Sequence, residues 1–243
     1  MNHEAKRTQG FTMVELLLAM GFISALLLAI AMTIIQIGTT YNKGMLSKEL
    51  NQISRTVSEE LTRNVSAVES FSLTDNYRAD RAGGRLCLGT YSYIWNNARA
   101  VSEGTIATPY IPGSKNPNNT PKETIRLVKI EDPSRLYCAK NGAGLFSQQT
   151  ILATDTNRTQ ELIAAGDRAL GLYNLTVTSA PSARDAASGQ QLYTINYTIG
   201  TLDVKAINLA NTGCKQPGEQ DADVQYCTLQ QFTIVLRTGN RVN

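Results

Sequence analysis

Four cysteines, Cys87, Cys138, Cys214 and Cys227, are the side chains best suited to covalent chemistry in this 243-residue chain. An even number of cysteines in an exported domain favours disulfide bonds, and four cysteines permit three pairings. We favour Cys214 with Cys227, and therefore Cys87 with Cys138, because turn residues (KQPGEQDADVQY) separate the first pair. A loop of that length is stabilised by about 3 kcal/mol in the entropic description of a disulfide. Zinc is the weaker alternative, since the chain has no Cys-x-x-Cys pair and no histidine near the cysteines.

Other catalytic and metal-binding patterns are weak. Asp221 and Asp223 have an Asp-x-Asp spacing that could assist calcium binding, but the oxygen ligands fall far short of a calcium loop. No pair of acids stands out for carboxylate-based hydrolysis. The only histidine is His3, at the extreme N-terminus. We therefore expect no catalytic residues, no metal and no cofactor.

Glu15 is an isolated carboxylate at the start of a long apolar segment. The twenty residues from Leu16 to Ile35 carry no charge, and a helix of that length covers roughly 30 Å, the hydrocarbon thickness of a bilayer. An ionisable group within a membrane span costs on the order of 3 kcal/mol, and such groups are usually functional and paired. The segment predicts one membrane span. The presence of Glu15 indicates that this span has a function besides anchoring the chain.

A short polar leader with Lys6 and Arg7 precedes the span. Positive charge beside a first span favours retention of that flank in the cytoplasm, so we expect the rest of the chain outside. A cleaved secretory signal has support in Ala29-Ile30-Ala31, whose small-x-small form suits signal peptidase. However, the apolar run continues to Ile37, and a signal core has no use for Glu15. A plain uncleaved signal anchor is a second interpretation.

A third interpretation rests on the sequence Gly10-Phe11-Thr12-Met13-Val14-Glu15, followed at once by the apolar helix. This pattern resembles the cleavage and methylation motif of type IV pilins, type II secretion pseudopilins and competence pseudopilins. In that family, prepilin peptidase cuts after the glycine, the new terminal residue, usually Phe, is N-methylated, and a glutamate is the fifth residue after the cut. The resemblance, over about the first forty residues, therefore implies cleavage between Gly10 and Phe11 and an assembly role for Glu15. The chain departs from many major pilins at Met32, where they place a helix-kinking proline.

Cleavage would place a new positive amine near the carboxylate. Glycine at the cut site leaves room for a protease to approach the backbone. Because a buried charge is tolerable only when paired, we hypothesise that Glu15 pairs with the Phe11 amine of a neighbouring subunit and sets the axial stagger. The alternative is that Glu15 merely lies at the membrane interface, where a carboxylate costs less. Cleavage also removes His3, so the mature chain lacks the histidine of Ser-His-Asp and Cys-His catalysis.

The composition is that of a folded domain with an anchor. Hydrophobic residues make up 42% and charged residues 18%, which argues against a disordered or many-spanning chain. The formal charge of +3 is too small to be a clear nucleic-acid signal. The densest basic run, Arg78, Arg81 and Arg85, is interrupted by Asp80 and is expected to be a solvated loop.

Helical periodicity returns after a weak helix-forming stretch, Gly38 to Gly44, which could be a flexible joint. Apolar residues then recur at three- and four-residue steps and predict an amphipathic helix to about residue 70 that packs on a sheet. These apolar positions are Leu46, Leu50, Ile53, Val57, Leu61, Val65 and Val68.

The remainder of the chain predicts strands and loops. Residues 191–199 alternate, which places Tyr193, Ile195, Tyr197 and Ile199 on one face of a strand. Other strand-like segments are 85–95, 123–131, 170–178 and 229–237, and turn-rich breakers occupy 103–122, 179–190 and 211–226. We expect an α+β, pilin-like fold in which one long N-terminal helix lies on an antiparallel sheet. The expected parts are the leader 1–10, the membrane and filament-core helix 11–37, its amphipathic continuation 38–71 and the exported β-rich domain 72–243.

The resemblance implies a structural filament subunit that is not an enzyme. Its expected partners are other pilin subunits through the N-terminal helix, prepilin peptidase, a membrane assembly platform, and the lipid bilayer before assembly. Its expected location is the cytoplasmic (inner) membrane, as a single-pass protein with the N-terminus inside, and then an extracellular pilus or pseudopilus. A C-terminal disulfide loop also resembles what many pilins carry.

Within that family, the large domain from residue 72 favours a minor or tip-associated subunit. The alternative function is a single-span surface adhesin or receptor that is neither processed nor assembled. A secreted enzyme cut near Ala31 is a third hypothesis. The machine served, whether for adhesion, twitching, DNA uptake or secretion, does not follow from the sequence.

Overall fold

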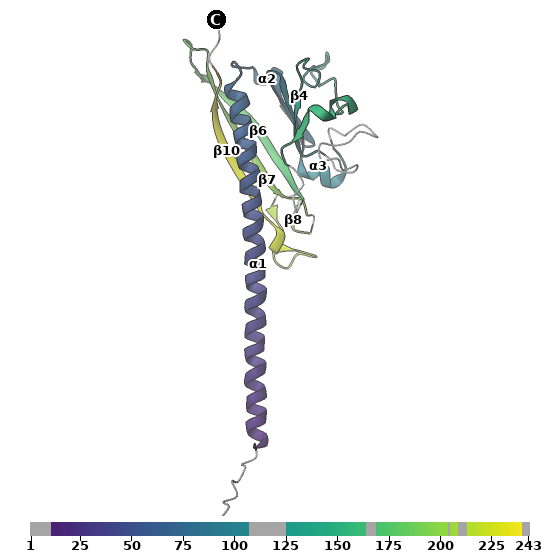
Figure 1. The fold of residues 1–243 in the computed structure, drawn as a ribbon. Coiled ribbons are helices and arrows are strands. Elements are labelled where there is room, and N and C mark those ends of the chain that lie inside the picture. The colour runs from purple at the N-terminus through teal and green to yellow at the C-terminus, as the bar shows by residue number, and fades with distance from the viewer. Residues whose placement is uncertain (1–10, 107–124, 164–168, 204, 209–212, 240–243) are drawn as a thin grey trace, which may run out of the picture.

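The protein has an α+β fold, in which one long N-terminal helix lies against antiparallel sheets (Figure 1). The computed structural model describes residues 11–106, 125–163, 169–203, 205–208 and 213–239. The predicted fold class is therefore confirmed. The proposed leader, residues 1–10, lies outside the described residues.

Helix α1 (Met13–Ser66) contains 54 residues, which corresponds to roughly 80 Å at 1.5 Å per residue. By length and composition it is apolar enough to cross a membrane. The predicted flexible joint is wrong, because the helix continues without a break through Gly38 and Gly44. Each glycine costs about 1 kcal/mol relative to alanine, and helical turns on both sides offset that cost. The helix ends at Ser66 rather than near residue 70.

The part of α1 from Leu46 to Ser66, its upper half in Figure 1, packs on a three-stranded antiparallel sheet. The strand order of this sheet is β10-β7-β6. Its strands are β6 (Leu170–Arg184), β7 (Gln191–Thr201) and β10 (Leu229–Arg237). The strands predicted at 191–199 and 229–237 are confirmed. Strand β6 begins at the predicted residue but continues past 178 to Arg184, because its pairing with β7 resumes after an irregularity.

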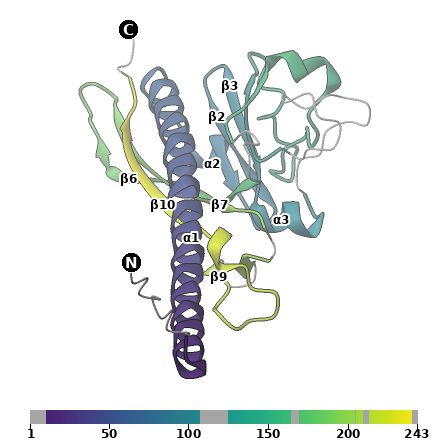
Figure 2. The same ribbon diagram turned by 60° about the horizontal axis from the view of Figure 1, so that its bottom comes forward.

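A second, five-stranded sheet lies beside α1 (Figure 2) and has the order β1-β2-β3-β4-β5. Its strands are β1 (Tyr77–Ala79), β2 (Gly83–Leu88), β3 (Tyr91–Asn96), β4 (Leu127–Glu131) and β5 (Thr159–Glu161). The single strand expected at 85–95 is wrong. Gly89 has a φ of +56° and turns the chain between Leu88 and Tyr91, so the segment forms most of a β2–β3 hairpin.

Short elements complete the described chain. They are α2 (Leu73–Asn76), α3 (Ala98–Glu103), the 3-10 helices η1 (Ala153–Arg158) and η2 (Val224–Tyr226), and a small hairpin of β8 (Ile207–Asn208) and β9 (Gly213–Cys214). Most of the Pro-rich breaker 103–122 lies outside the described residues.

The main core joins α1 to both sheets. The helix contributes Leu46, Leu50, Val57, Leu61 and Val65, each at most 1% exposed. These side chains pack with the inward face of β7 and with β2–β4. The predicted face of β7 is confirmed, since its four residues Tyr193, Ile195, Tyr197 and Ile199 are also at most 1% exposed.

Two polar contacts show that α1 runs alongside β10. Gln230 near the start of β10 donates to the Asn51 side chain (3.3 Å), and Ser66 donates to the Arg237 carbonyl (3.3 Å). Fifteen helical residues advance roughly 22 Å, and seven strand residues advance roughly 23 Å. The two elements are therefore nearly aligned over the whole length of the strand.

Candidate functional site

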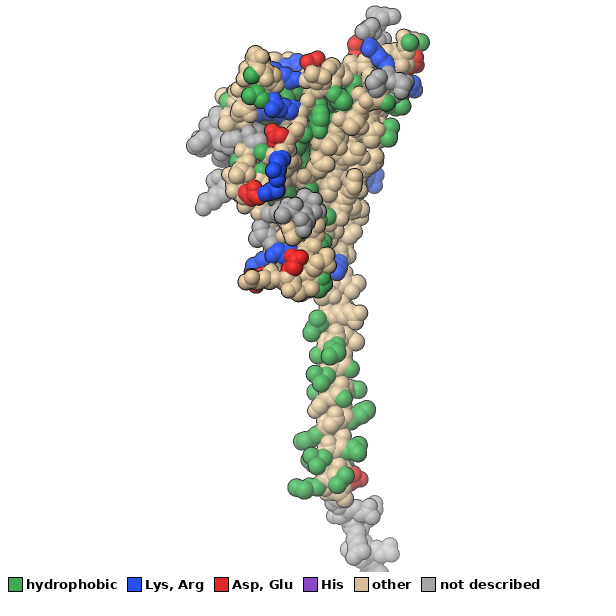
Figure 3. Space-filling model, turned by 180° about the vertical axis from the view of Figure 1, so that it is seen from behind, with side chains coloured by type: hydrophobic (Ala, Val, Ile, Leu, Met, Phe, Trp, Pro, Cys, Tyr) green, Lys and Arg blue, Asp and Glu red, His purple; other side chains and the backbone are tan. Residues whose placement is uncertain are grey.

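The lower half of α1 is an apolar rod that the domain does not cover. Its large hydrophobic side chains between Phe11 and Tyr41 range from 46% exposed at Ile30 to 86% exposed at Met13. In Figure 3, hydrophobic side chains project from this part of the helix below the domain. Soluble monomers rarely expose a continuous apolar surface of this size. Such a surface suits contact with lipid or with other apolar helices.

A capping box begins the rod. The backbone N–H of Glu15 donates to the Thr12 hydroxyl (3.2 Å), and Glu15 Oε2 accepts from the Thr12 backbone N–H (3.1 Å) and hydroxyl (3.0 Å). This reciprocal pair satisfies donors that the first helical turn leaves unpaired. The Thr-x-x-Glu spacing of this cap is readable in the sequence, but neither interpretation of Glu15, as a partner for another subunit or as a carboxylate at the membrane interface, included it.

The capping box leaves Glu15 with unused acceptor capacity. Both side-chain hydrogen bonds fall on Oε2, and no described residue donates to Oε1. An ionised carboxylate offers about four acceptor positions, so Glu15 can keep its cap and accept a further donor. Phe11 lies beside it at the same helix end and is 82% exposed. Gly10, the other side of the proposed cut, lies outside the described residues.

The upper half of α1 attaches to the domain through polar as well as apolar contacts. The Tyr197 hydroxyl lies 2.8 Å from the Ser54 hydroxyl and 2.7 Å from the Ser58 hydroxyl, and donates to the Ser54 carbonyl (2.9 Å). The Tyr197 hydroxyl can be buried at little cost because these hydrogen-bond partners replace the water it would otherwise contact. One tyrosine on β7 therefore connects the sheet to two turns of the helix.

Glu60 makes a second connection, to the five-stranded sheet. Its carboxylate forms ion pairs with Lys129 on β4 and with Arg63, and it accepts from the Asn64 amide (2.8 Å). Burial raises the pKa of Glu60, but hydrogen bonds from Lys129 and Asn64 and the charges of Lys129 and Arg63 outweigh it and leave the pKa below its ordinary value. Glu60 is therefore ionised and structurally paired at neutral pH.

Both disulfides follow the pairing favoured from the sequence. Cys87 on β2 is bonded to Cys138, 51 residues later, and this bond ties the sheet to the segment after β4. Cys214 on β9 is bonded to Cys227, 13 residues later, and closes the loop that contains η2. The loop includes Asp221, which adopts a left-handed turn with φ +56°.

Comparisons with family models, with curated proteins and with solved structures find no match. The strongest candidate site is therefore defined by geometry, as the uncovered apolar rod with Phe11, Thr12 and Glu15 at its end. In the described part of the chain, no group of three or more His, Cys, Asp or Glu side chains is arranged to hold a metal ion. The surface of the rod suits contact with lipid or with other apolar helices, and Glu15 at its end can accept a further hydrogen bond.

Proposed function

We propose that the protein is a structural subunit of a type IV pilus or a related type II secretion or competence pseudopilus. The division of α1 carries the proposal: residues 11–41 are bare and apolar, whereas the residues from Leu46 onward form the core of a folded domain. A helix used only to complete a soluble domain would not continue so far beyond it. A rod of this kind suits a bilayer first and a bundle of identical helices afterwards.

The proposed pathway begins in the cytoplasmic membrane. The basic leader stays inside, the rod spans the bilayer and the β-rich domain lies outside. Prepilin peptidase cuts between Gly10 and Phe11, Phe11 is N-methylated, and an assembly platform passes the subunit to the filament. The large domain supports a minor or tip-associated place, and no catalytic step is part of the proposal.

Glu15 directs the packing in this proposal. Its free Oε1 accepts from the Phe11 amine of the next subunit, and the pair fixes the axial position of one rod against another. Because a charge in an apolar bundle is costly alone, a subunit whose carboxylate lacks this partner is disfavoured. The rods then associate in one register instead of sliding along their apolar surfaces.

Mass spectrometry of the native N-terminus tests the processing step. A mature chain that begins at methylated Phe11 is the expected result, and Gly10→Val should retain the leader. Gly142→Val is the matched control, since a side chain at Gly142 meets nothing within 4 Å and the residue is remote from the cut. An intact leader in the native protein would reject processing and favour the single-span adhesin or receptor.

A charge-neutral substitution tests the assembly step. Glu15→Gln should leave the membrane level of the protein unchanged and reduce its recovery in sheared filaments by tenfold or more. Glu59→Gln is the control, since Glu59 lies exposed on the same helix and pairs only with Arg55 among the described contacts. Equal recovery of the Glu15→Gln and native chains would reject the pairing. Abundance in the sheared fraction separates a major from a minor subunit.

A further inference from the structure

A small cavity lies in the β-rich domain, between the β1–β2 region and the segment after β4. Its volume is about 90 Å³, and its walls include Arg78, Asp80, Gly84, Arg85, Phe146 and Gln149. A cavity needs roughly 10–15 Å³ of such volume to hold one water, so this cavity has room for a small organic group. None of these residues takes part in the proposed assembly.

Arg85 is the buried charged residue among the cavity walls and is only 3% exposed. The expectation of a solvated basic loop is therefore wrong for Arg85, which lies within β2. Its Nη1 donates to the Tyr137 carbonyl (2.8 Å), and its guanidinium lies 5.0 Å from the centre of the Phe146 ring. Its Nη2 is buried and has no hydrogen-bond partner among the described residues.

The charge of Arg85 is incompletely balanced. No described carboxylate forms an ion pair with it, although Asp132 attracts it at longer range. Burial lowers the pKa of Arg85 to about 10, so it stays cationic at neutral pH. A buried charge without a close counterion is costly, and an anion held beside it would lower that cost.

Neighbouring groups reinforce the preference for an anion. Arg78 lines the cavity and donates to the Gly144 carbonyl (3.3 Å), and the Lys140 ammonium lies 6.0 Å from the Phe146 ring centre. Asp80 is the acidic wall residue, and its Oδ1 already accepts from the backbone N–H groups of Ala82 (2.8 Å) and Gly83 (3.1 Å). Cations therefore outnumber the carboxylate around the cavity.

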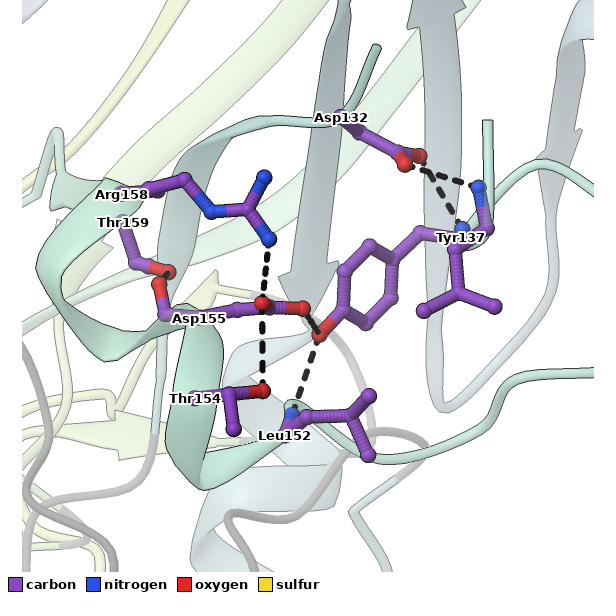
Figure 4. A network of polar contacts seen from close by, with 8 residues as sticks. Asp132, Tyr137, Leu152, Thr154, Asp155, Arg158 and Thr159 are labelled. Atoms are coloured by element: carbon purple, nitrogen blue, oxygen red, sulfur yellow. Dashed lines mark hydrogen bonds and ion pairs between the residues drawn. The ribbon is translucent and has the colours of Figure 1, made fainter. Parts of the chain in front are cut away.

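A polar network (Figure 4) joins the chain before and after the wall residues 145–149. Tyr137 donates through its hydroxyl to Asp155 (2.6 Å) and accepts from the Leu152 backbone N–H (3.0 Å). Asp132 accepts from the backbone N–H groups of Leu136 (2.7 Å) and Tyr137 (3.0 Å). The Cys87–Cys138 disulfide adds a covalent tie. The residue whose carbonyl accepts from Arg85, Tyr137, is thus held by hydrogen bonds at its backbone and side chain.

We propose that this cavity binds an organic carboxylate, whose oxygens accept from the Arg78 guanidinium and lie beside the charge of Arg85 while its carbon chain lies against the wall residues Phe146 and Leu145. Guanidinium groups match carboxylate geometry, and the aromatic wall suits a carbon chain better than it suits inorganic phosphate. The carboxylate belongs either to a free small acid or to the C-terminus of a peptide. The site is independent of filament assembly.

Thermal unfolding of the full chain in detergent micelles tests the proposal. Propionate at constant ionic strength should raise the unfolding temperature saturably, whereas its neutral isostere propionamide should not. N-acetylated triglycine tests the peptide source. A saturable rise of the unfolding temperature with its free C-terminus, and none with the amidated form, would identify a peptide C-terminus; no rise with either form would leave the free acid. Inorganic phosphate at the same concentration should have a smaller effect than propionate. Equal shifts with propionate and propionamide would overturn the proposal.

Two variants localise the binding. Arg85→Gln should abolish the propionate-dependent shift, and Arg78→Gln, a substitution at an exposed position, should weaken propionate affinity several-fold without unfolding the domain. Arg99→Gln is the control, since Arg99 pairs with Glu103 on α3. Carboxyl ¹³C NMR line broadening of propionate measures binding directly if Arg85→Gln does not fold. Unchanged broadening with Arg78→Gln, or equal weakening with Arg99→Gln, would reject this cavity as the site.

Discussion

The two halves of α1 have the same backbone conformation and opposite surroundings. In the lower half, Leu27 is 59% exposed, whereas in the upper half Leu61 is fully buried. The upper half also contains paired polar residues such as Ser54 and Glu60, whose partners lie on the sheets. The lower half is almost uniformly apolar and has its carboxylate at the end. The comparison teaches that the upper half is specified by its own domain, whereas no described part of the chain covers the lower half.

The largest effect should come from truncating matched leucines. Leu61→Ala should lower the free energy of unfolding of the domain by about 4 kcal/mol, because it leaves a cavity in the core. Leu27→Ala should leave domain unfolding unchanged, because the domain does not touch that side chain. Thermal unfolding in detergent micelles measures both. Similar losses from the two variants would mean that the rod folds back on the domain.

Two glutamates on the same helix provide a second contrast. Glu60→Gln should cost about 3 kcal/mol at neutral pH, because it leaves Lys129 partly buried without its counterion. The folded-state pKa of Glu60 lies below 4.5, so its contribution is present above pH 4.5 and is lost as the pH falls through the folded-state value. The difference between native and variant chains should therefore shrink below pH 4.5.

Thermal unfolding between pH 7 and pH 3 measures this loss. Glu15→Gln should show no such pH-dependent difference in domain stability, since its contacts are confined to Thr12 in the described structure. A constant deficit for Glu60→Gln across the range would contradict the ionised pair.

A smaller contrast comes from two tyrosines. Tyr197→Phe should cost about 2 kcal/mol, because it removes a hydroxyl that contacts two serines of α1 and leaves those groups buried. Tyr41→Phe, at a position 66% exposed at the top of the rod, should change domain stability by less than about 0.5 kcal/mol. Urea unfolding followed by circular dichroism compares them. A neutral Tyr197→Phe would show that the helix is held by apolar contacts alone.

Glycine substitutions at the boundary between the two halves of α1 should have the smallest effect on stability. Gly38→Ala and Gly44→Ala should each stabilise the helix by about 1 kcal/mol, since an added Cβ meets nothing within 4 Å. Slower amide hydrogen exchange over residues 36–46 is the expected result. Unchanged domain unfolding in the same variants would confine the effect to the boundary. Faster exchange would show that the continuous helix is strained there.

The sequence allows prediction where the information is local. The stripe from Leu46 to Val65 and the alternation in 191–199 each report burial through their own periodicity, and both faces are confirmed. The Glu60–Lys129 pair was missed because 69 positions separate its partners. Arg85 was misassigned because a dense local run of charges suggested solvent, whereas the sheet pairs Arg85 with Ile94 across the hairpin and buries it.

The candidate site and the cavity show the same difference between local patterns and contacts that are distant in sequence. Glu15 is conspicuous because its neighbours are apolar, and Thr12 three residues earlier makes its cap readable from spacing alone. The hairpin at Gly89 was missed because one glycine within an apolar run does not distinguish a strand from two strands joined by a turn. The cavity beside Arg85 depends on a segment some 60 residues away in sequence, between Leu145 and Gln149, and no local pattern indicates that approach.

The near alignment of α1 with β10 has a mechanical consequence. A pull along the rod would load the helix–sheet contact in shear, so that the contacts from Gln230–Asn51 to Ser66–Arg237 would resist together. A perpendicular helix would instead be peeled away one contact at a time. Because α1 is continuous, no slack joint would extend before the domain felt the force. Tension applied at one end of this molecule would therefore reach the β domain through a stiff connection whose strength grows with the length of the overlap.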